Sequence, residues 1–388
     1  MSASIYRTAS PTAQPWICSL ILFLVHSLTY HGCQSMPVRW LFGRSYGFVS
    51  PLQRPASLRQ TSLNGAIAGI QPSGELHIGN YIGCIHPAVQ YQNEKGDLIF
   101  MVADLHATTG NNQSVIYVLF TGRQENGRLN DMTKKTVATL LACGIDPTRT
   151  SVILQSEFPS ILELHWILGT VISLGRLRKL ANFERREVAR DSDNMAADVL
   201  GSGCDTVIAG PDQECHVNLI REVAEKLNRQ ISEDLLRIPK LYVNSGFRVL
   251  SLDGAGKMSK SNVNDSRRVN LLDSSDAIAE KLRSAKTSTS RDASSPEVEN
   301  LFRLYSFFSS EPLPDVANDT ENFQFSILKD KLHRSMTSHL GGIQRRYEDL
   351  VKNEDTLRQA LSAGKTRMLP VFESIVERVK HRSHYYKT

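Results

Sequence analysis

Short apolar runs alternate with longer amphipathic segments from residue 65 onward. The apolar runs read "GAIAGI", "LIFMVADLH", "SVILQS" and "DTVIAG", at residues 65–70, 98–106, 151–156 and 205–210, and their length and composition predict buried strands. Between them, residues 80–92, 133–144, 161–173 and 213–228 carry apolar positions at helical spacing. This alternation predicts an α/β fold, a parallel sheet covered by helices, with ligands bound at the carboxyl ends of the strands.

The pattern changes at about Asp273, after which the strand-like runs stop. Residues 295–308 and 354–379 keep helical spacing, and Pro296 occupies the predicted first helical position of the earlier segment. We therefore predict an α/β domain over residues 62–272 and an α-helical domain over residues 273–388.

Residues 1–61 differ in composition from the rest of the chain. The first acidic residue is Glu75, and before it the chain has five arginines, no lysine, and ten serines up to Ser62. An arginine- and serine-rich N-terminus without acidic residues is typical of an organelle transit peptide. We therefore predict that residues 1–61 are a leader and that the protein acts in the mitochondrial matrix.

Two features of this leader leave alternatives open. The apolar run "WICSLILFLV", Trp16 to Val25, has the length of the hydrophobic region of a secretory signal and is too short to span a bilayer. Translation from Met36 would instead give an arginine-rich presequence that lacks this run. The composition of the whole segment favours the transit peptide.

The rest of the chain is close to electrical balance. The net formal charge of +5 comes from the five leader arginines, because the remaining residues include 40 basic and 40 acidic ones. Any binding to nucleic acid must therefore depend on a local patch and not on the net field. The six cysteines are scattered without a C-x-x-C pair, which argues against a zinc ribbon or a disulfide framework. We predict no metal-binding residues.

A glycine-rich turn follows the first predicted strand. The stretch "GIQPSGELHIGNYIG", Gly69 to Gly83, contains four glycines and leads from the strand into a predicted helix. Glycine permits sharp turns and a close approach to a ligand, and a helix start presents unpaired N–H groups that favour an anion. Taken alone, the stretch fits either a phosphate-binding loop or a tight structural turn.

A second loop of similar character lies far downstream. The stretch "GAGKMSKSN", Gly254 to Asn262, carries Lys257 and Lys260 between glycines and serines. A lysine ammonium is a mobile charge suited to phosphate, and glycines allow a loop to close over a ligand. A solvated charged loop has the same composition. Two such loops, however, nearly 180 residues apart, predict one nucleotide held from both sides.

The two loops resemble the signatures of class I aminoacyl-tRNA synthetases. "HIGN", at residues 77–80, resembles the first signature, and "KMSKS", at residues 257–261, matches the second. The segments "GIQPSG", "VADLHA", "LLACGIDP", "NMAAD" and "GPDQECHVNLIREVAEKLN" are similar to tryptophanyl-tRNA synthetases of the bacterial and mitochondrial type. The resemblance extends from about Gly69 to the C-terminus.

The resemblance implies a fold, a reaction and partners. It implies a Rossmann-like catalytic domain followed by a helical anticodon-binding domain, and a homodimer without membrane attachment. The implied reaction uses ATP, with Mg²⁺ carried on the ATP phosphates, to activate L-tryptophan and transfer it to tRNA(Trp). The C-terminal stretch "VKHRSHYYKT" offers basic and aromatic groups to the tRNA, although a frayed, solvated helix end is an alternative.

The resemblance assigns the nucleotide to the two loops. Lys257 and Lys260 would stabilise the leaving pyrophosphate, and His77 and Asn80 would act with them as catalytic residues. The residues that the resemblance assigns to ATP binding are Gln71, Ser73, Gly74, His77, Gly79, Asn80, Met258, Ser259 and Ser261.

The resemblance assigns the amino-acid substrate to a second group of residues. Asp198 would accept the indole N–H, because an indole offers one donor on a large apolar body. An exposed carboxylate at a helix end is the alternative interpretation of Asp198. The residues assigned to substrate binding are Met195, Asp198, Gly210, Asp212 and Gln213. Asp104 and His106 also end a predicted strand, without an assigned chemical step.

The sequence departs from the family pattern near the amino-acid pocket. The family has a Tyr-Pro pair shortly before "MAAD", whereas here Asp191 stands near the place of the tyrosine. Upstream of "GIQPSG", Ile67 and Ala68 replace an aromatic residue and a serine that the family often has. Three alternatives therefore stay open: a tyrosyl-tRNA synthetase, a nucleotidyltransferase acting on another small acid, and a non-catalytic protein descended from a synthetase.

One further stretch does not fit the alternation. "SVIYVLFTGRQENG", Ser114 to Gly127, places a β-like apolar run inside a polar loop. A surface hairpin and an error in exon joining both account for it. The segment before Asn194 also looks shortened relative to the family, which has the same two explanations.

Overall fold

The structure is a computed structural model that describes residues 65–109, 126–173, 175–176, 195–243, 247–254, 256–260, 264–287, 295–309 and 325–383. The described residues all belong to one compact unit. The predicted leader, Asp191 and residues 114–125 of the poorly fitting stretch lie outside the described residues. The last two residues of that stretch, Asn126 and Gly127, begin helix α6.

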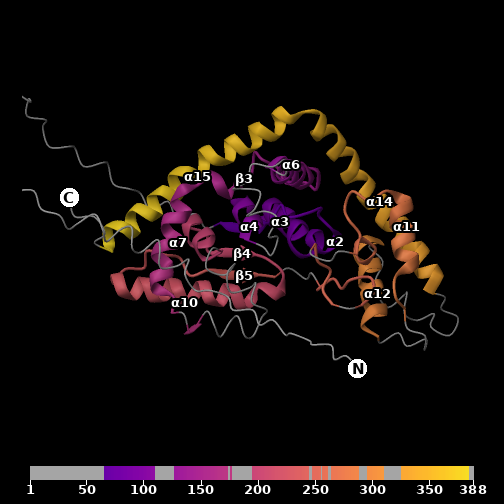
Figure 1. Ribbon diagram of the computed structural model, residues 1–388, viewed down its shortest axis with the longest axis horizontal. Coiled ribbons are helices and arrows are strands. Elements are labelled where there is room, and N and C mark those ends of the chain that lie inside the picture. The colour runs from indigo at the N-terminus through magenta and orange to yellow at the C-terminus, as the bar shows by residue number, and fades with distance from the viewer. Residues whose placement is uncertain are drawn as a thin grey trace, which may run out of the picture. The chain divides into compact units, whose positions relative to one another are not determined.

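Five parallel strands form one sheet in the order β3-β2-β1-β4-β5 (Figure 1). The strands are β1 (Ala66–Ile70), β2 (Leu98–Val102), β3 (Thr150–Leu154), β4 (Thr206–Ile208) and β5 (Lys240–Tyr242). This confirms the predicted α/β fold with a parallel sheet. Strand β5 was not predicted, because it has three residues and its side chains are exposed or half-buried, so it leaves no apolar run in the sequence.

Helices and helical turns connect the strands and follow the sheet. Those of the α/β part are α2 (Ile78–Asn80), the π-helical turn η1 (Tyr81–Ile85), α3 (His86–Glu94), α4 (Asp104–Thr109), α6 (Asn126–Ala142), the 3-10 turn η2 (Gln155–Glu157), α7 (Pro159–Val171), the 3-10 turn η3 (Pro211–Gln213) and α10 (Glu214–Ile231). Those that follow are the 3-10 turn η4 (Asp265–Arg267), α11 (Ser275–Ser284), α12 (Pro296–Ser309), α14 (Phe325–Lys352) and α15 (Glu354–Arg382). The predicted strand 98–106 ends early, at Val102, because Asp104 begins α4.

The strands divide their side chains between two cores. Along β2, Leu98, Phe100 and Val102 join one hydrophobic cluster, and Ile99 and Met101 join the other, as the two-residue period of a strand requires. The first cluster includes residues of α3 and α6, and the second includes residues of α7 and α10. The sheet is therefore apolar on both faces, which explains why its strands appear in the sequence as continuous apolar runs.

Helix α15 lies along the edge strand β3 (Figure 1). Its residues Leu357 and Ala360 belong to the first hydrophobic cluster, whereas Met368 and Phe372 belong to the second. The helix therefore crosses from one face of the sheet to the other, and it does so at Gly364, next to the backbone of Val152. An exposed edge strand invites pairing with other chains, and this helix covers it. The domain boundary at residue 273 stays a prediction.

Candidate active site

The first glycine-rich turn ends in a reciprocal helix cap. His77 is the N-cap of α2: its Nδ1 accepts a hydrogen bond from the Asn80 backbone N–H at 3.3 Å, and Asn80 Oδ1 accepts from the His77 N–H at 3.2 Å. Burial, together with nearby cations led by Lys260, lowers the pKa of His77 to about 3. The imidazole is therefore neutral and available as an acceptor. The spacing of three residues between these two side chains is that of a capping box.

Glycine is required at position 79. A Cβ atom added to Gly79 would lie 2.9 Å from His77 Nδ1, against the ring that caps the helix, and 3.6 Å from Cβ of Met258 in the second loop. A Cβ atom added to Gly74 would lie 3.9 Å from Cβ of Lys260. The two loops, which are far apart in sequence, therefore lie side by side.

The second loop is a tight reversal that presents its lysines to different neighbours. Met258 N donates to Val249 O at 3.0 Å, and Gly254 and Gly256 have φ values of 71° and 146°, which favour glycine. Lys260 Nζ donates to the carbonyl oxygen of Gln71, directly after β1, at 2.6 Å. Lys257 Nζ pairs with Asp212, in the turn that follows β4. Both lysines therefore reach the carboxyl ends of central strands.

The charge of Lys260 changes near neutral pH. Burial and the nearby Arg268 lower the pKa of Lys260 to about 7, although Cys84 acts in the opposite direction. The charged ammonium is then present in the free protein below about pH 7 and is lost above it. We expect kcat/KM for ATP to fall by up to about tenfold per pH unit above pH 7, measured as a pH profile of ATP–pyrophosphate exchange. Lys260→Arg keeps its charge across this range, so its profile should be flat. An unchanged decline in this variant would assign the titration to another group.

A buried polar triad forms where β2 and β3 end. Asp198 accepts hydrogen bonds from Gln155 Nε2 at 2.8 and 3.0 Å, and its Oδ2 lies 2.9 Å from His106 Nε2. The three residues are at most 6% exposed. Asp198 is therefore a buried carboxylate between two strand ends, and the alternative of an exposed helix-end carboxylate is wrong. A carboxylate has about four acceptor sites, so these contacts leave room for one more donor.

The sequence interpretation missed Gln155. This residue directly follows β3, and besides contacting Asp198 it accepts a hydrogen bond from the His106 N–H at 3.3 Å. Asp104, after β2, accepts from Ser156 N at 2.9 Å and from the Ser156 hydroxyl, which joins the ends of β2 and β3. The sequence did contain a signal for Gln155: it is a polar residue directly after a predicted apolar strand. Ligands bind at the carboxyl ends of the strands in a parallel sheet.

Asp212 connects the turn after β4 with the second loop. Its Oδ2 accepts from Gln213 Nε2 at 2.9 Å and pairs with Lys257 Nζ. Burial opposes ionisation of this carboxyl group, but the hydrogen bond and charge of Lys257, together with the hydrogen bond from Gln213, outweigh it and lower the pKa of Asp212. A Cβ atom at Gly210 would lie 2.6 Å from Asp212 Oδ1, so the turn before η3 needs glycine to seat this carboxylate.

The remaining predicted residues lie in varied surroundings. Ser73 is exposed, Met195 and Ser259 are half-buried, and Ser261 lies outside the described residues. Met258 is 1% exposed and packs in the first hydrophobic cluster, so its backbone is the part that can face a nucleotide. Ile67 and Ala68 are buried in β1 and belong to different clusters. Within the described part of the chain, we find no group of three or more His, Cys, Asp or Glu residues that could hold a metal ion.

Comparison with known proteins places this site in a family. Residues 61–358 match the model of the class I tRNA synthetases for W and Y. The chain is 32% identical to the chloroplastic/mitochondrial tryptophan–tRNA ligase of Arabidopsis thaliana, over 78% of each protein. It is 31% identical to the tryptophan–tRNA ligase of Rickettsia prowazekii, over 77% of this chain and 92% of that one.

A solved structure agrees with these relatives. The tryptophanyl-tRNA synthetase of Campylobacter jejuni, crystallised with ADP and tryptophan, superposes with a TM-score of 0.65 at 25% identity. The superposition covers 82% of this chain and 99% of that one. The fold, the two apposed loops and the extent of the match lead to one conclusion: the chain belongs to the class I tRNA synthetases of the tryptophan and tyrosine group.

Proposed function

We propose that this protein activates L-tryptophan with ATP and ligates it to tRNA(Trp) in mitochondrial translation. The observation that carries the proposal is the contact of Lys260 Nζ with Gln71 O, which brings the second loop onto the first. A nucleotide between them would meet an ammonium on one side and the N-terminus of a helix on the other. Both favour phosphate.

The reaction consists of two displacements without a side-chain nucleophile. The tryptophan carboxylate attacks the α-phosphorus of ATP, the bond from this phosphorus to the bridging oxygen breaks, and pyrophosphate leaves. A terminal ribose hydroxyl of the tRNA then attacks the activated carbonyl, and AMP leaves. Lys257 and Lys260 stabilise the charge that moves onto pyrophosphate, and His77, Asn80 and the loop glycines hold the nucleotide.

Mg²⁺ would be held by the phosphates of the bound nucleotide. The two loops offer ammonium and backbone N–H groups, which would bind phosphate oxygens and not a cation. The ion supplies charge neutralisation on the phosphates when bound. The protein residues act around it by positioning the triphosphate and by excluding water.

Asp198 is the residue that selects the amino acid. Its carboxylate is held between Gln155 and His106, and the half-buried Met195 packs against the hydrophobic cluster that contains Ala196 and Val199. An acceptor in apolar surroundings suits the single donor of an indole. We propose tryptophan and not tyrosine as the substrate, because the matching ligases of Arabidopsis and Rickettsia are named for tryptophan. The chain matches both over most of its length.

Asp198→Asn should raise the KM for tryptophan by about 100-fold and change the KM for ATP less than twofold. The substitution removes the charge and turns one acceptor oxygen into a donor that faces Gln155 or His106. Initial rates of pyrophosphate exchange at varied tryptophan and ATP measure both constants. Asp131→Asn, on the exposed surface of α6, is the control. A parallel rise of both KM values would show that Asp198 does not distinguish the two substrates.

The helical part is proposed to hold the tRNA anticodon, but Lys380 and Arg382 of the C-terminal stretch contribute less than its composition indicates. Lys380 Nζ contacts Glu163 at 3.1 Å and Glu377 at 2.7 Å, and Arg382 pairs with Glu233 at 2.7 Å. Carboxylates of the protein therefore already neutralise these cations. The exposed residues Lys331, Arg334 and Arg345 of α14 are better candidates for phosphate contacts.

Separate observations support the proposed homodimer and the proposed mitochondrial location. On α7, Leu162 and Trp166 lie one helical turn apart and are 56% and 73% exposed, and exposed apolar side chains of this size mark an interaction surface. The arginine-rich leader and the chloroplastic/mitochondrial relative support a mitochondrial protein. None of the described helices is long and apolar enough to cross a membrane.

Amino-acid-dependent ATP–pyrophosphate exchange by the full chain tests the proposal. Exchange with tryptophan and not with tyrosine, followed by charging of tRNA(Trp), is the expected result. Exchange with tyrosine would identify a tyrosyl enzyme. A folded protein that binds ATP but exchanges with neither would instead be a nucleotidyltransferase for another small acid or a non-catalytic descendant of a synthetase.

A further inference from the structure

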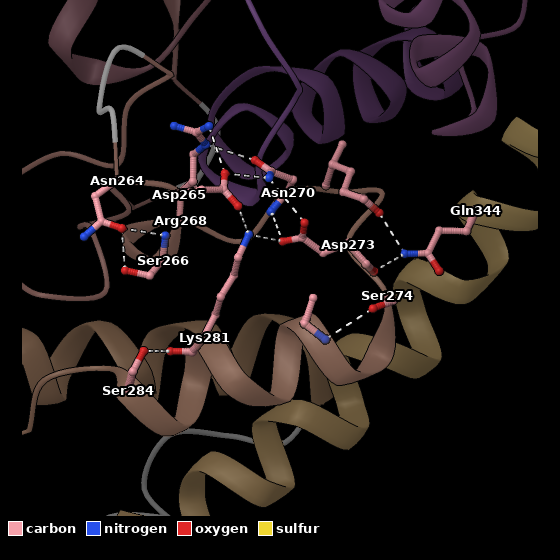
Figure 2. Close-up of polar contacts among 12 residues, drawn as sticks. Asn264, Asp265, Ser266, Arg268, Asn270, Asp273, Ser274, Lys281, Ser284 and Gln344 are labelled. Carbon is pink, nitrogen blue, oxygen red and sulfur yellow. Dashed lines mark hydrogen bonds and ion pairs between the residues drawn. The ribbon is translucent and has the colours of Figure 1, made fainter.

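A cluster of charged and polar side chains lies beside the two loops, outside the predicted site residues. It consists of Asp265, Arg268, Asn270, Asp273 and Lys281, which we call the joint cluster (Figure 2). Lys281 extends from α11 to the carboxylates of Asp265 and Asp273, the latter at 2.7 Å. Arg268 pairs with Asp265 at 2.9 Å, and Asn270 Nδ2 donates to Asp265 and Asp273 at 3.0 and 3.2 Å. Two cations thus balance two anions.

Three of the four charged side chains in this cluster are buried, whereas that of Asp265 is 50% exposed, and this burial indicates a role beyond stability. The side chains of Lys281, Asp273 and Arg268 are 10%, 12% and 16% exposed, so their charges have lost most of their hydration. The attraction within a buried ion pair often does no more than offset that loss, and apolar residues of similar volume are often as stable. What such a cluster supplies is a defined geometry for the segments that it joins.

The joint cluster reaches the second loop through Arg268. Its Nη1 donates to the carbonyl oxygen of Lys260 at 3.3 Å, and its Nε donates to Asn270 Oδ1 at 3.1 Å. Arg268, which contacts the Lys260 backbone, is therefore itself held by Asn270. A displacement of Arg268 would move the ammonium that is proposed to meet the phosphates.

The same segment reaches the first loop through its backbone. Asn270 forms a β-bridge with His77, in which Ile78 N donates to Val269 O at 3.0 Å and Leu271 N donates to Leu76 O at 2.8 Å. Residues 269–271 therefore fix the turn that places the His77 cap. The segment that carries the joint cluster therefore contacts both loops.

Two helices anchor the other side of the joint cluster. Gln344 Nε2 of α14 donates to the carbonyl oxygens of Leu271 and Asp273 at 3.0 and 2.9 Å. Ser274 caps α11, with its Oγ accepting from Ala277 N at 3.2 Å. Figure 2 shows Lys281 rising from α11 between the carboxylates of Asp265 and Asp273.

We propose that Lys281 is a positioning residue for amino-acid activation, which acts through Arg268 and Asn270 on Lys260 and His77. The proposal rests on the proposed function, because it concerns the same two loops. Lys281 touches neither nucleotide nor amino acid. It holds the segment 264–273 in the arrangement that places the two loops next to each other. Its removal should therefore impair use of ATP and leave recognition of tryptophan intact.

Kinetics of pyrophosphate exchange by full-length Lys281→Met test this proposal. We expect kcat to fall 10- to 30-fold and the KM for ATP to rise at least threefold, with the KM for tryptophan changed less than twofold. Lys134→Met removes an exposed lysine paired with Glu354 and serves as the matched control, with rates equal to wild type. Equal changes in the KM values of ATP and tryptophan, or none, would overturn the proposal.

A double-mutant cycle tests whether Lys281 acts through Lys260. In the Lys260→Ala background, Lys281→Met should slow exchange by a smaller factor than in the wild-type background, because the Lys260 ammonium is gone and only the effect through His77 remains. A further loss equal to that seen in the wild-type background would show that Lys281 acts elsewhere, and the proposal would fail. The double variant Lys281→Met/Asp273→Asn avoids an unpaired buried carboxylate and replaces the single variant if that one does not fold.

Trypsin digestion of the free protein separates failure of this proposal from failure of the proposed function. Cleavage after Lys257 and Lys260, followed by mass spectrometry, should be at least fivefold faster in Lys281→Met than in wild type and in Lys134→Met. Faster cleavage in a protein without any exchange activity would retain the positioning role and reject the enzyme. Unchanged cleavage would reject the positioning role even in an active enzyme.

Discussion

Lys260→Ala should slow tryptophan-dependent ATP–pyrophosphate exchange by about 10²- to 10³-fold, the loss typical of removing one preorganised charge from a reacting centre. Lys260 lies at the contact of the two loops, where its Nζ donates to Gln71 O at 2.6 Å. A partly buried ammonium acts in a medium of lower dielectric than water, so its effect on moving phosphate charge is larger than that of a surface lysine. The initial rate of exchange at saturating tryptophan measures the effect.

Lys134→Ala is the matched control for this substitution. Lys134 has a side chain 44% exposed and pairs with Glu354, far from the loops in sequence and in contacts. Its loss should leave the exchange rate unchanged, since surface ion pairs contribute little. A Lys260→Ala variant with at least a third of the wild-type rate would contradict the assignment of this lysine to pyrophosphate.

Gly364→Ala should lower the free energy of unfolding by about 3 kcal/mol, through overpacking against backbone that cannot move aside. A Cβ atom at this position would lie 2.0 Å from the carbonyl oxygen of Val152 and 2.8 Å from its carbon. Helix α15 would have to separate from β3 where it crosses the edge of the sheet. Urea unfolding followed by circular dichroism gives the difference.

A glycine-to-alanine substitution at Gly341 should instead raise the free energy of unfolding. A Cβ atom at Gly341, in the middle of α14, would meet only the flexible end of Arg345, at 3.8 Å. Alanine is the better helix former by about 1 kcal/mol, so Gly341→Ala should stabilise the protein. A stabilising effect of Gly364→Ala as well would show that α15 does not press against the strand.

Prediction from the sequence succeeded where the signal was local or was shared with a family. The apolar runs placed β1 to β4, and helical spacing placed α7, α10, α12 and α15, because these patterns depend on residues a few positions apart. The three exposed or half-buried residues of β5 carry no such pattern. The motifs "HIGN" and "KMSKS" identified the family from residue types alone.

The functional site shows the limit of local reasoning more clearly. Asp198 was named from its motif, but its partners were not, because Gln155 and His106 stand 43 and 92 positions away. The joint cluster was not foreseen at all. Asp265, Asp273 and Lys281 look like ordinary solvated charges in the sequence. The burial of Asp273 and Lys281 follows only from the packing of α11 and the segment before it, whereas the Asp265 side chain stays 50% exposed.

The sequence by itself determined the alternation of strands and helices and the family. Each of these depends on spacing within a few residues or on a motif. Only the tertiary structure decided that Lys260 meets Gln71, 189 positions away, that Asp198 is buried between two strand ends, and that α15 crosses β3 at Gly364. The physical reason is that burial and long-range contacts are set by how the elements pack, and a residue's type does not reveal which distant neighbour will share its site.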